Sequence, residues 1–176
     1  LLMGSLDIGH TLYMQGVLQG TIQKAARDSS LESGTATATQ TTIDTNIRNA
    51  VKDLNTSLLD SDITITRRYY KTFSTAAAAQ AETWTDTNGN STCDNNEPYS
   101  DANNNNTWDR DGGNSGQGGA KDITVYNVSV TYTHLFPLWK LLGRSSTQTV
   151  KASTVLANQP YGAQTQYAAA TTRNCP

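Results

Sequence analysis

The middle of the chain, between residues 74 and 122, is a stretch of about fifty residues rich in Asp, Asn, Gly and Ser, without a continuous helical or strand pattern. Stretches of this length without secondary structure are uncommon inside a compact domain unless something orders them. A bound metal ion is one such cause, because it adds its binding free energy to folding. A flexible linker is the alternative, since clusters of Asn, Asp and Gly are also typical of linkers.

Residues 86–97 have the ligand spacing of an EF-hand calcium loop. Such a loop supplies side-chain oxygens at positions 1, 3, 5, 9 and 12 and a backbone carbonyl at position 7. The predicted ligands in that order are Asp86, Asn88, Asn90, Thr92, Asp94 and Glu97. Position 6 departs from the pattern, because Ser91 replaces the glycine that favours a sharp turn.

The same register begins again at Asp101. Its predicted ligands are Asp101, Asn103, Asn105, Thr107 and Asp109. Position 12 is Gly112, so a second ion would need Asp111 or the nearby Glu97. Oxygen ligands without histidine or cysteine favour calcium over zinc or copper. We therefore predict a calcium-binding loop over residues 86–111, followed by a mobile glycine-rich run at 112–119.

Hydrophobic spacing predicts two helices before this loop. Residues 1–32 contain no proline, and their apolar residues recur at helical spacing. A second, amphipathic helix is expected from Thr41 or Thr42 to about Leu59. Gly16 and Gly20 form a small-xxx-small pair that allows close helix contact, although chance also explains so short a motif.

Three segments rich in β-branched and aromatic residues predict strands, at 62–73, 123–135 and 147–156. A short helical turn is expected at 138–143. This order of elements indicates an α+β fold, with the second helix packed on a small antiparallel sheet and the calcium loop inserted between strands. We expect an N-terminal assembly helix at 1–33, truncated at its start, and a globular domain at 34–176. The run LLMGSL is too short to span a bilayer by itself.

Cys93 and Cys175 are the two cysteines and have no metal-binding spacing. A disulfide between them would close about 80 residues and stabilise the fold by roughly 4 kcal/mol. Two unpaired thiols are the alternative. Disulfides are typical of oxidising compartments, so the pair favours an exported protein.

Charge and motifs argue against several functions. With 13 basic and 15 acidic residues, the chain has no basic stripe for nucleic acid. The sequence contains no nucleophile, metalloprotease or phosphate-loop motif, and a strand-edge role for His134 is favoured over catalysis. Asp7 lies in an apolar helical segment, where it needs either a partner or solvent.

Residues 7–27, which end in Ala25-Ala26-Arg27, resemble the segment after the membrane anchor in TadE-like proteins of the tight-adherence pilus system. Residues 128–142, with Phe136-Pro137, and residues 149–161 are similar to the paired strands of that family. The resemblance implies a pilin-like or pseudopilin-like subunit. Such a subunit inserts in the bacterial inner membrane and then packs through its N-terminal helix with other subunits, its globular domain lying outside the cell.

Three functions follow from these features. The first is a non-enzymatic filament or pilus-assembly subunit, packed through residues that include Leu2, Leu6, Gly16 and Gly20 and stabilised by calcium. The second is a calcium-dependent adhesin or carbohydrate-binding module, in which Trp84, Tyr99 and Trp108 stack on sugars. Packing of the loop against the sheet is the favoured explanation of these aromatics. The third, a secreted hydrolase, lacks a nameable nucleophile and base.

Overall fold

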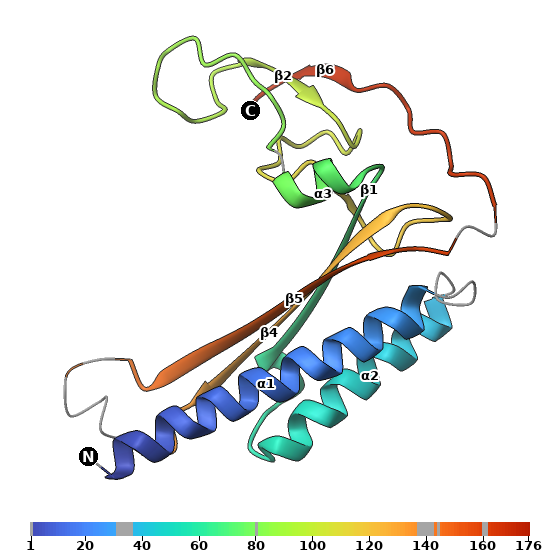
Figure 1. Ribbon diagram of the computed structural model, residues 1–176. Coiled ribbons are helices and arrows are strands. Elements are labelled where there is room, and N and C mark those ends of the chain that lie inside the picture. Colours follow the sequence, from blue (N-terminus) through green and yellow to red (C-terminus); the bar gives the residue numbers. More distant parts are fainter. Residues whose placement is uncertain (1, 31–36, 80, 137–142, 144, 160–161) are drawn as a thin grey trace. The chain divides into compact units, whose positions relative to one another are not determined.

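The structure is a computed structural model that describes residues 2–30, 37–79, 81–136, 143, 145–159 and 162–176. It has an α+β fold with a long first helix, as predicted (Figure 1). The elements in chain order are α1 (Leu2–Ser30), α2 (Thr37–Leu54), η2 (Asp60–Asp62), β1 (Ile63–Tyr70), α3 (Phe73–Ala78), β2 (Pro98–Asp101), β3 (Asn114–Ser115), β4 (Ile123–Thr133), β5 (Thr147–Ala157) and β6 (Thr171–Asn174). The helical turn expected at 138–143 lies outside the described residues, except for Gly143.

The strands form two sheets. One has the order β3-β1-β4-β5, and the other pairs β2 with β6. The residues group into two compact units, each with most of its contacts inside itself and each built from two separate parts of the sequence. Unit 1 comprises 1–67 and 125–156, and unit 2 comprises 68–124 and 157–176.

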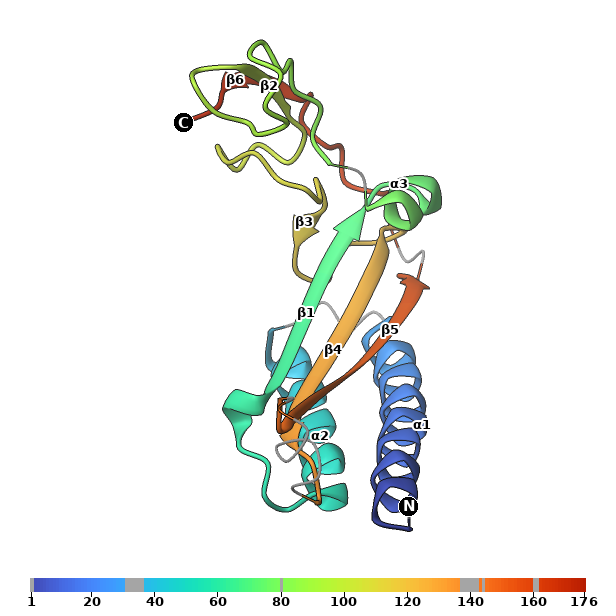
Figure 2. The same cartoon turned by 90° about the vertical axis from the view of Figure 1, so that its left-hand side faces the viewer.

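The core of unit 1 lies between the two long helices and one face of the sheet, and both helices lie on that same face (Figures 1 and 2). Alternate residues of β4 point into this core, as expected from the two-residue period of a strand. They are Tyr126, Val128, Val130 and Tyr132, each at most 4% exposed. Between them, Asn127 and Thr131 are exposed and Ser129 is partly exposed.

Helix α1 has a buried stripe and an exposed apolar segment. Met14, Leu18 and Ile22 recur every four residues and are at most 1% exposed. The first thirteen residues instead carry large apolar side chains that are more than half exposed. These are Leu2, Met3, Leu6, Ile8, Leu12 and Tyr13. No helix within the described residues is long and apolar enough to cross a membrane.

Helix α2 begins and ends earlier than predicted. Thr41 and Thr42 lie inside it rather than at its N-terminus. The helix stops at Leu54 because the Asn55 side chain accepts a hydrogen bond from the Ser57 amide at 3.1 Å, which is a turn rather than a helical pairing. Leu58 reaches the core from this turn and is 5% exposed.

Asp7 is buried and partnered rather than solvated. Its carboxylate accepts a hydrogen bond from the Leu135 amide at 3.1 Å and lies 2.7 Å from Nδ1 of His134. The side chains of Asp7 and His134 are 3% and 9% exposed. This pair joins the first turns of α1 to the end of β4 within unit 1.

In unit 2 the glycine-rich run at 112–119, for which we predict mobility, contains a short strand. Its residues Asn114 and Ser115 form β3, which pairs antiparallel with Tyr69 and Arg68 of β1. The ring of Tyr70 packs so closely on Gly113 that a side chain there would overlap it.

Candidate metal-binding loops

The two Asp-Asn segments, loop 1 (86–97) and loop 2 (101–112), fold in the same way. In each, the aspartate at position 1 accepts hydrogen bonds from the backbone amides of positions 5 and 6. For Asp86 these amides belong to Asn90 at 3.2 Å and Ser91 at 2.9 Å. For Asp101 they belong to Asn105 at 3.0 Å and Asn106 at 2.9 Å. The sequence repeat is therefore a repeat of structure.

The backbone repeats as well. Positions 4 and 6 have a positive φ in both loops, namely 73° and 59° at Gly89 and Ser91, and 56° and 66° at Asn104 and Asn106. Ser91 thus adopts the left-handed conformation that glycine would favour, and the departure at position 6 does not change the turn.

In each loop, two asparagine side chains donate hydrogen bonds to the aspartate at position 9. Asn88 and Asn90 each donate a side-chain N–H to the carboxylate of Asp94, at 3.0 and 2.9 Å. Asn103 and Asn105 do the same to Asp109, at 3.0 and 2.7 Å. The amides of Thr92 and Thr107, at position 7, donate to the Asn90 and Asn105 side chains.

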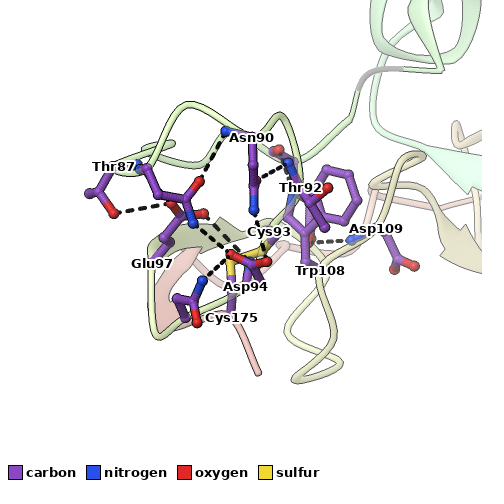
Figure 3. Close-up of a disulfide and its surroundings, with 12 residues drawn as sticks. Thr87, Asn90, Thr92, Cys93, Asp94, Glu97, Trp108, Asp109 and Cys175 are labelled. Atoms are coloured by element: carbon purple, nitrogen blue, oxygen red, sulfur yellow. Dashed lines mark hydrogen bonds between the residues drawn. A yellow bond between two sulfur atoms is a disulfide. The ribbon is translucent and has the colours of Figure 1, made fainter.

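Glu97 closes loop 1 from position 12, as the register requires (Figure 3). Its Oε1 accepts from the Thr87 amide at 2.7 Å, and its Oε2 accepts from the Asp94 amide at 3.5 Å. The side chain is 1% exposed. A carboxylate so deeply buried is held by the loop's own backbone.

Glu82, which sequence reasoning missed, closes loop 2 with the same contacts. Its Oε1 accepts from the Ala102 amide at 2.7 Å, and its Oε2 accepts from the Asp109 amide at 3.0 Å. These are positions 2 and 9 of loop 2, the positions that Glu97 contacts in loop 1. The two carboxylates considered for this role from sequence are used elsewhere, since Glu97 belongs to loop 1 and Asp111 binds Tyr70 and Arg68.

A short antiparallel pairing explains how Glu82 reaches loop 2. Trp84 bridges to Tyr99, and backbone hydrogen bonds flank this bridge on both sides. Continuing the register by two residues places Glu82 opposite Asp101. The sequence signal was available, because Glu82 precedes Asp86 by the same four residues by which Glu97 precedes Asp101. Two sequence repeats, 82–96 and 97–111, therefore each begin at a glutamate. Glu82 of the first repeat closes loop 2, and Glu97 of the second repeat closes loop 1.

The donor atoms of both loops suit calcium. Loop 1 carries the carboxylates of Asp86, Asp94 and Glu97 together with two amide oxygens, and loop 2 carries those of Asp101, Asp109 and Glu82 with two more. Oxygen donors of this kind are what calcium prefers. Among the described residues no three carboxylate, histidine or cysteine side chains meet closely enough to hold an ion. The asparagine N–H groups lie against the carboxylates, so a central cation requires these amides to turn their oxygens inward.

The two loops differ in their electrostatic surroundings. Nε of Arg173 lies 2.5 Å from Oδ2 of Asp101, whose side chain is fully buried. Burial acts to raise the pKa of Asp101, but the Asn106 amide, the Arg173 guanidinium and the Asn105 amide together lower it. No ion pair within the described part of the chain involves a loop 1 carboxylate.

The disulfide and the aromatic side chains form a small core beside the loops. Cys93 and Cys175 are joined, with their Cα atoms 5.4 Å apart, which confirms the predicted bond (Figure 3). Tyr99 is 3% exposed, and the rings of Trp84 and Trp108 meet edge to face at 4.9 Å. Packing, here against the disulfide rather than the large sheet, therefore accounts for these aromatics better than a sugar-stacking surface does.

Comparison of the chain with protein-family models, with curated proteins and with solved structures finds no match.

Proposed function

We propose that this protein is a non-enzymatic structural subunit of an extracellular pilus-like filament or of its assembly complex, of the kind that the TadE-like resemblance implies. In this proposal α1 packs against other subunits, and before assembly it associates with the bacterial inner membrane. Loops 1 and 2 bind calcium and stabilise unit 2. The observation that carries the proposal is the exposed apolar segment of α1.

The segment's exposure favours an intermolecular role. Leu2, Leu6 and Leu12 are 74%, 53% and 66% exposed, whereas Met14, Leu18 and Ile22 of the same helix are buried. A contiguous exposed apolar surface is typical of an interaction site. Burying one such leucine against a neighbour contributes about 1.5–3 kcal/mol. Gly16 and Gly20 have no atom within 4 Å of a built Cβ, so they leave room for a second helix to approach.

The paired loops support the calcium part of the proposal. Two loops with the same ligand register, the same positive-φ positions and equivalent buried glutamates are difficult to explain as linker. The disulfide supports export, because such bonds persist in oxidising compartments.

A matched pair of leucine substitutions tests the assembly role. Leu12 and Leu59 are both 66% exposed, but Leu59 lies outside α1, in the turn before β1. We expect Leu12→Asp to abolish concentration-dependent self-association, measured by light scattering and electron microscopy, and Leu59→Asp to leave it unchanged. Equal behaviour of both variants and the unmodified protein would count against packing through α1.

Thermal unfolding with calcium and with a chelator tests the metal. An ion that binds only the folded state raises Tm by mass action. We expect a calcium-dependent rise that Glu97→Gln reduces, because this change removes a loop 1 carboxylate. Magnesium serves as the control ion, since it requires a tighter octahedral site. An unchanged Tm would contradict calcium binding by residues 86–111 and leave them a structural role without metal.

A further inference from the structure

Loops 1 and 2 match in fold and in their three carboxylates but not in neighbouring charge. Loop 2 has a guanidinium in direct contact with its first aspartate, at 2.5 Å. In the part of the chain that the structure describes, no Lys or Arg forms an ion pair with Asp86, Asp94 or Glu97. Among the residues that the structure describes, the carboxylates of loop 1 therefore have no ion-pair partner, whereas the first aspartate of loop 2 has one.

Arg173 is held at this place by the strand that carries it. β6 pairs antiparallel with β2, so that Arg173 lies opposite Tyr99 and Thr171 opposite Asp101. The Thr171 hydroxyl donates to the Asn104 side chain at 2.5 Å, and Asn104 donates to the Ala169 carbonyl at 3.2 Å. Cys175, two residues beyond Arg173, is fixed by the disulfide. The guanidinium is thus built into loop 2 rather than lying there as a mobile surface charge.

A fixed positive charge beside a buried carboxylate has two effects. It stabilises the carboxylate without a metal, because it supplies the charge-assisted hydrogen bond that a buried anion needs. It also repels an incoming divalent cation, because the same-sign interaction over a few Å is worth at least a factor of ten in affinity, roughly 1.4 kcal/mol or more.

We propose that Arg173 is the resident counter-cation of loop 2. Loop 1 then binds calcium at least about tenfold more tightly than loop 2, which keeps its fold without metal. This inference rests on the proposed calcium function and adds to it an order of binding set by one side chain.

Ion counting by native mass spectrometry of the oxidised full chain tests the proposal. At a free calcium concentration that loads the unmodified protein with one ion, Arg173→Gln is expected to gain a second ion, because the repulsion is removed. Arg173→Lys keeps the charge and is expected to stay at one ion. Intact mass of the Cys93–Cys175 bond and circular dichroism confirm that each variant is folded.

Substitutions in the loops assign the ions. In the unmodified protein, Glu97→Gln and Asp94→Asn are expected to remove the single ion, whereas Glu82→Gln and Asp109→Asn are expected to leave it. In the Arg173→Gln background, the two loop 2 changes are expected to remove the second ion.

The outcomes separate the two proposals. Two ions of equal affinity in the unmodified protein, no gain in Arg173→Gln, or a single ion lost with Glu82→Gln would each overturn the role of Arg173 while leaving calcium binding intact. No ion in any variant would overturn the calcium function itself.

Discussion

At the scale of single residues, Tyr70 at the end of β1 contacts the start of the glycine-rich run 112–119. A Cβ built on Gly113 would lie 2.5 Å from Cζ of Tyr70. The Tyr70 hydroxyl donates to Asp111 at 2.5 Å, and burial together with this bond raises the pKa of Tyr70 above its ordinary value. Tyr70 is thus fixed at both its ring and its hydroxyl, and cannot easily move to make room.

We therefore expect Gly113→Ala to lower the free energy of unfolding by about 1–3 kcal/mol, the usual cost of overpacking. Gly20→Ala is the matched control, because its built Cβ meets nothing within 4 Å and alanine favours a helix by up to about 1 kcal/mol. Urea unfolding of both variants measures the difference. A neutral Gly113→Ala would mean that Tyr70 is not held in this position.

At the scale of elements, the outer edge of β5 is covered by side chains of α1. Nε2 of Gln15 donates to the Lys151 carbonyl at 2.7 Å, and Nε2 of Gln19 donates to the Ser153 carbonyl at 3.3 Å. An edge strand with free carbonyls can pair with another chain. The glutamines, one helical turn apart, occupy alternate carbonyls of the strand and so block such pairing.

The double substitution Gln15→Ala and Gln19→Ala is expected to lower the free energy of unfolding by about 1–3 kcal/mol, at roughly 0.5–1.5 kcal/mol for each of the two hydrogen bonds. It is also expected to increase sheet-type aggregation, measured by a thioflavin assay. Gln23 is an exposed residue of the same helix, and Gln23→Ala is expected to change neither the stability nor the aggregation. Aggregation that stays at the level of Gln23→Ala would argue against edge protection.

Elements with a long hydrophobic period are predictable from this sequence, and short ones are not. The apolar stripes of α1 and the alternation in β4 and β5 are local properties of the chain, so their positions follow from it. The end of α2 depends on one asparagine side chain, and β2 and β6, four residues each, exist because distant segments pair. The role of Glu82 does not follow from the spacing within loop 2 for a related reason, because Glu82 lies outside that loop and reaches it through the pairing of Trp84 with Tyr99.

At the scale of the whole molecule, both ends of the disulfide lie in unit 2, as do β2, β6 and the loops. Reduction should therefore act on unit 2. We expect loss of about 4 kcal/mol from that unit, because the bond closes a span of 82 residues. The helices and sheet core of unit 1 should keep their stability.

Hydrogen exchange of the reduced protein, or of Cys93→Ser with Cys175→Ser, checks this expectation. Amides in β2 and loops 1 and 2 should exchange faster, and those in α1 and α2 should stay protected. Equal loss of protection in both units would show instead that the molecule unfolds as one cooperative body.

The crossed closure of the two loops has an effect on chain entropy. Loop 1 lies in the chain between Glu82 and Asp101. When loop 1 is folded and Trp84 is paired with Tyr99, fewer flexible residues separate Glu82 from loop 2, and closing that stretch costs less entropy. Whatever orders the first loop therefore lowers the entropic cost of completing the second. The folding of the two loops, which are closed by different glutamates, is in this way coupled through the connectivity of the backbone.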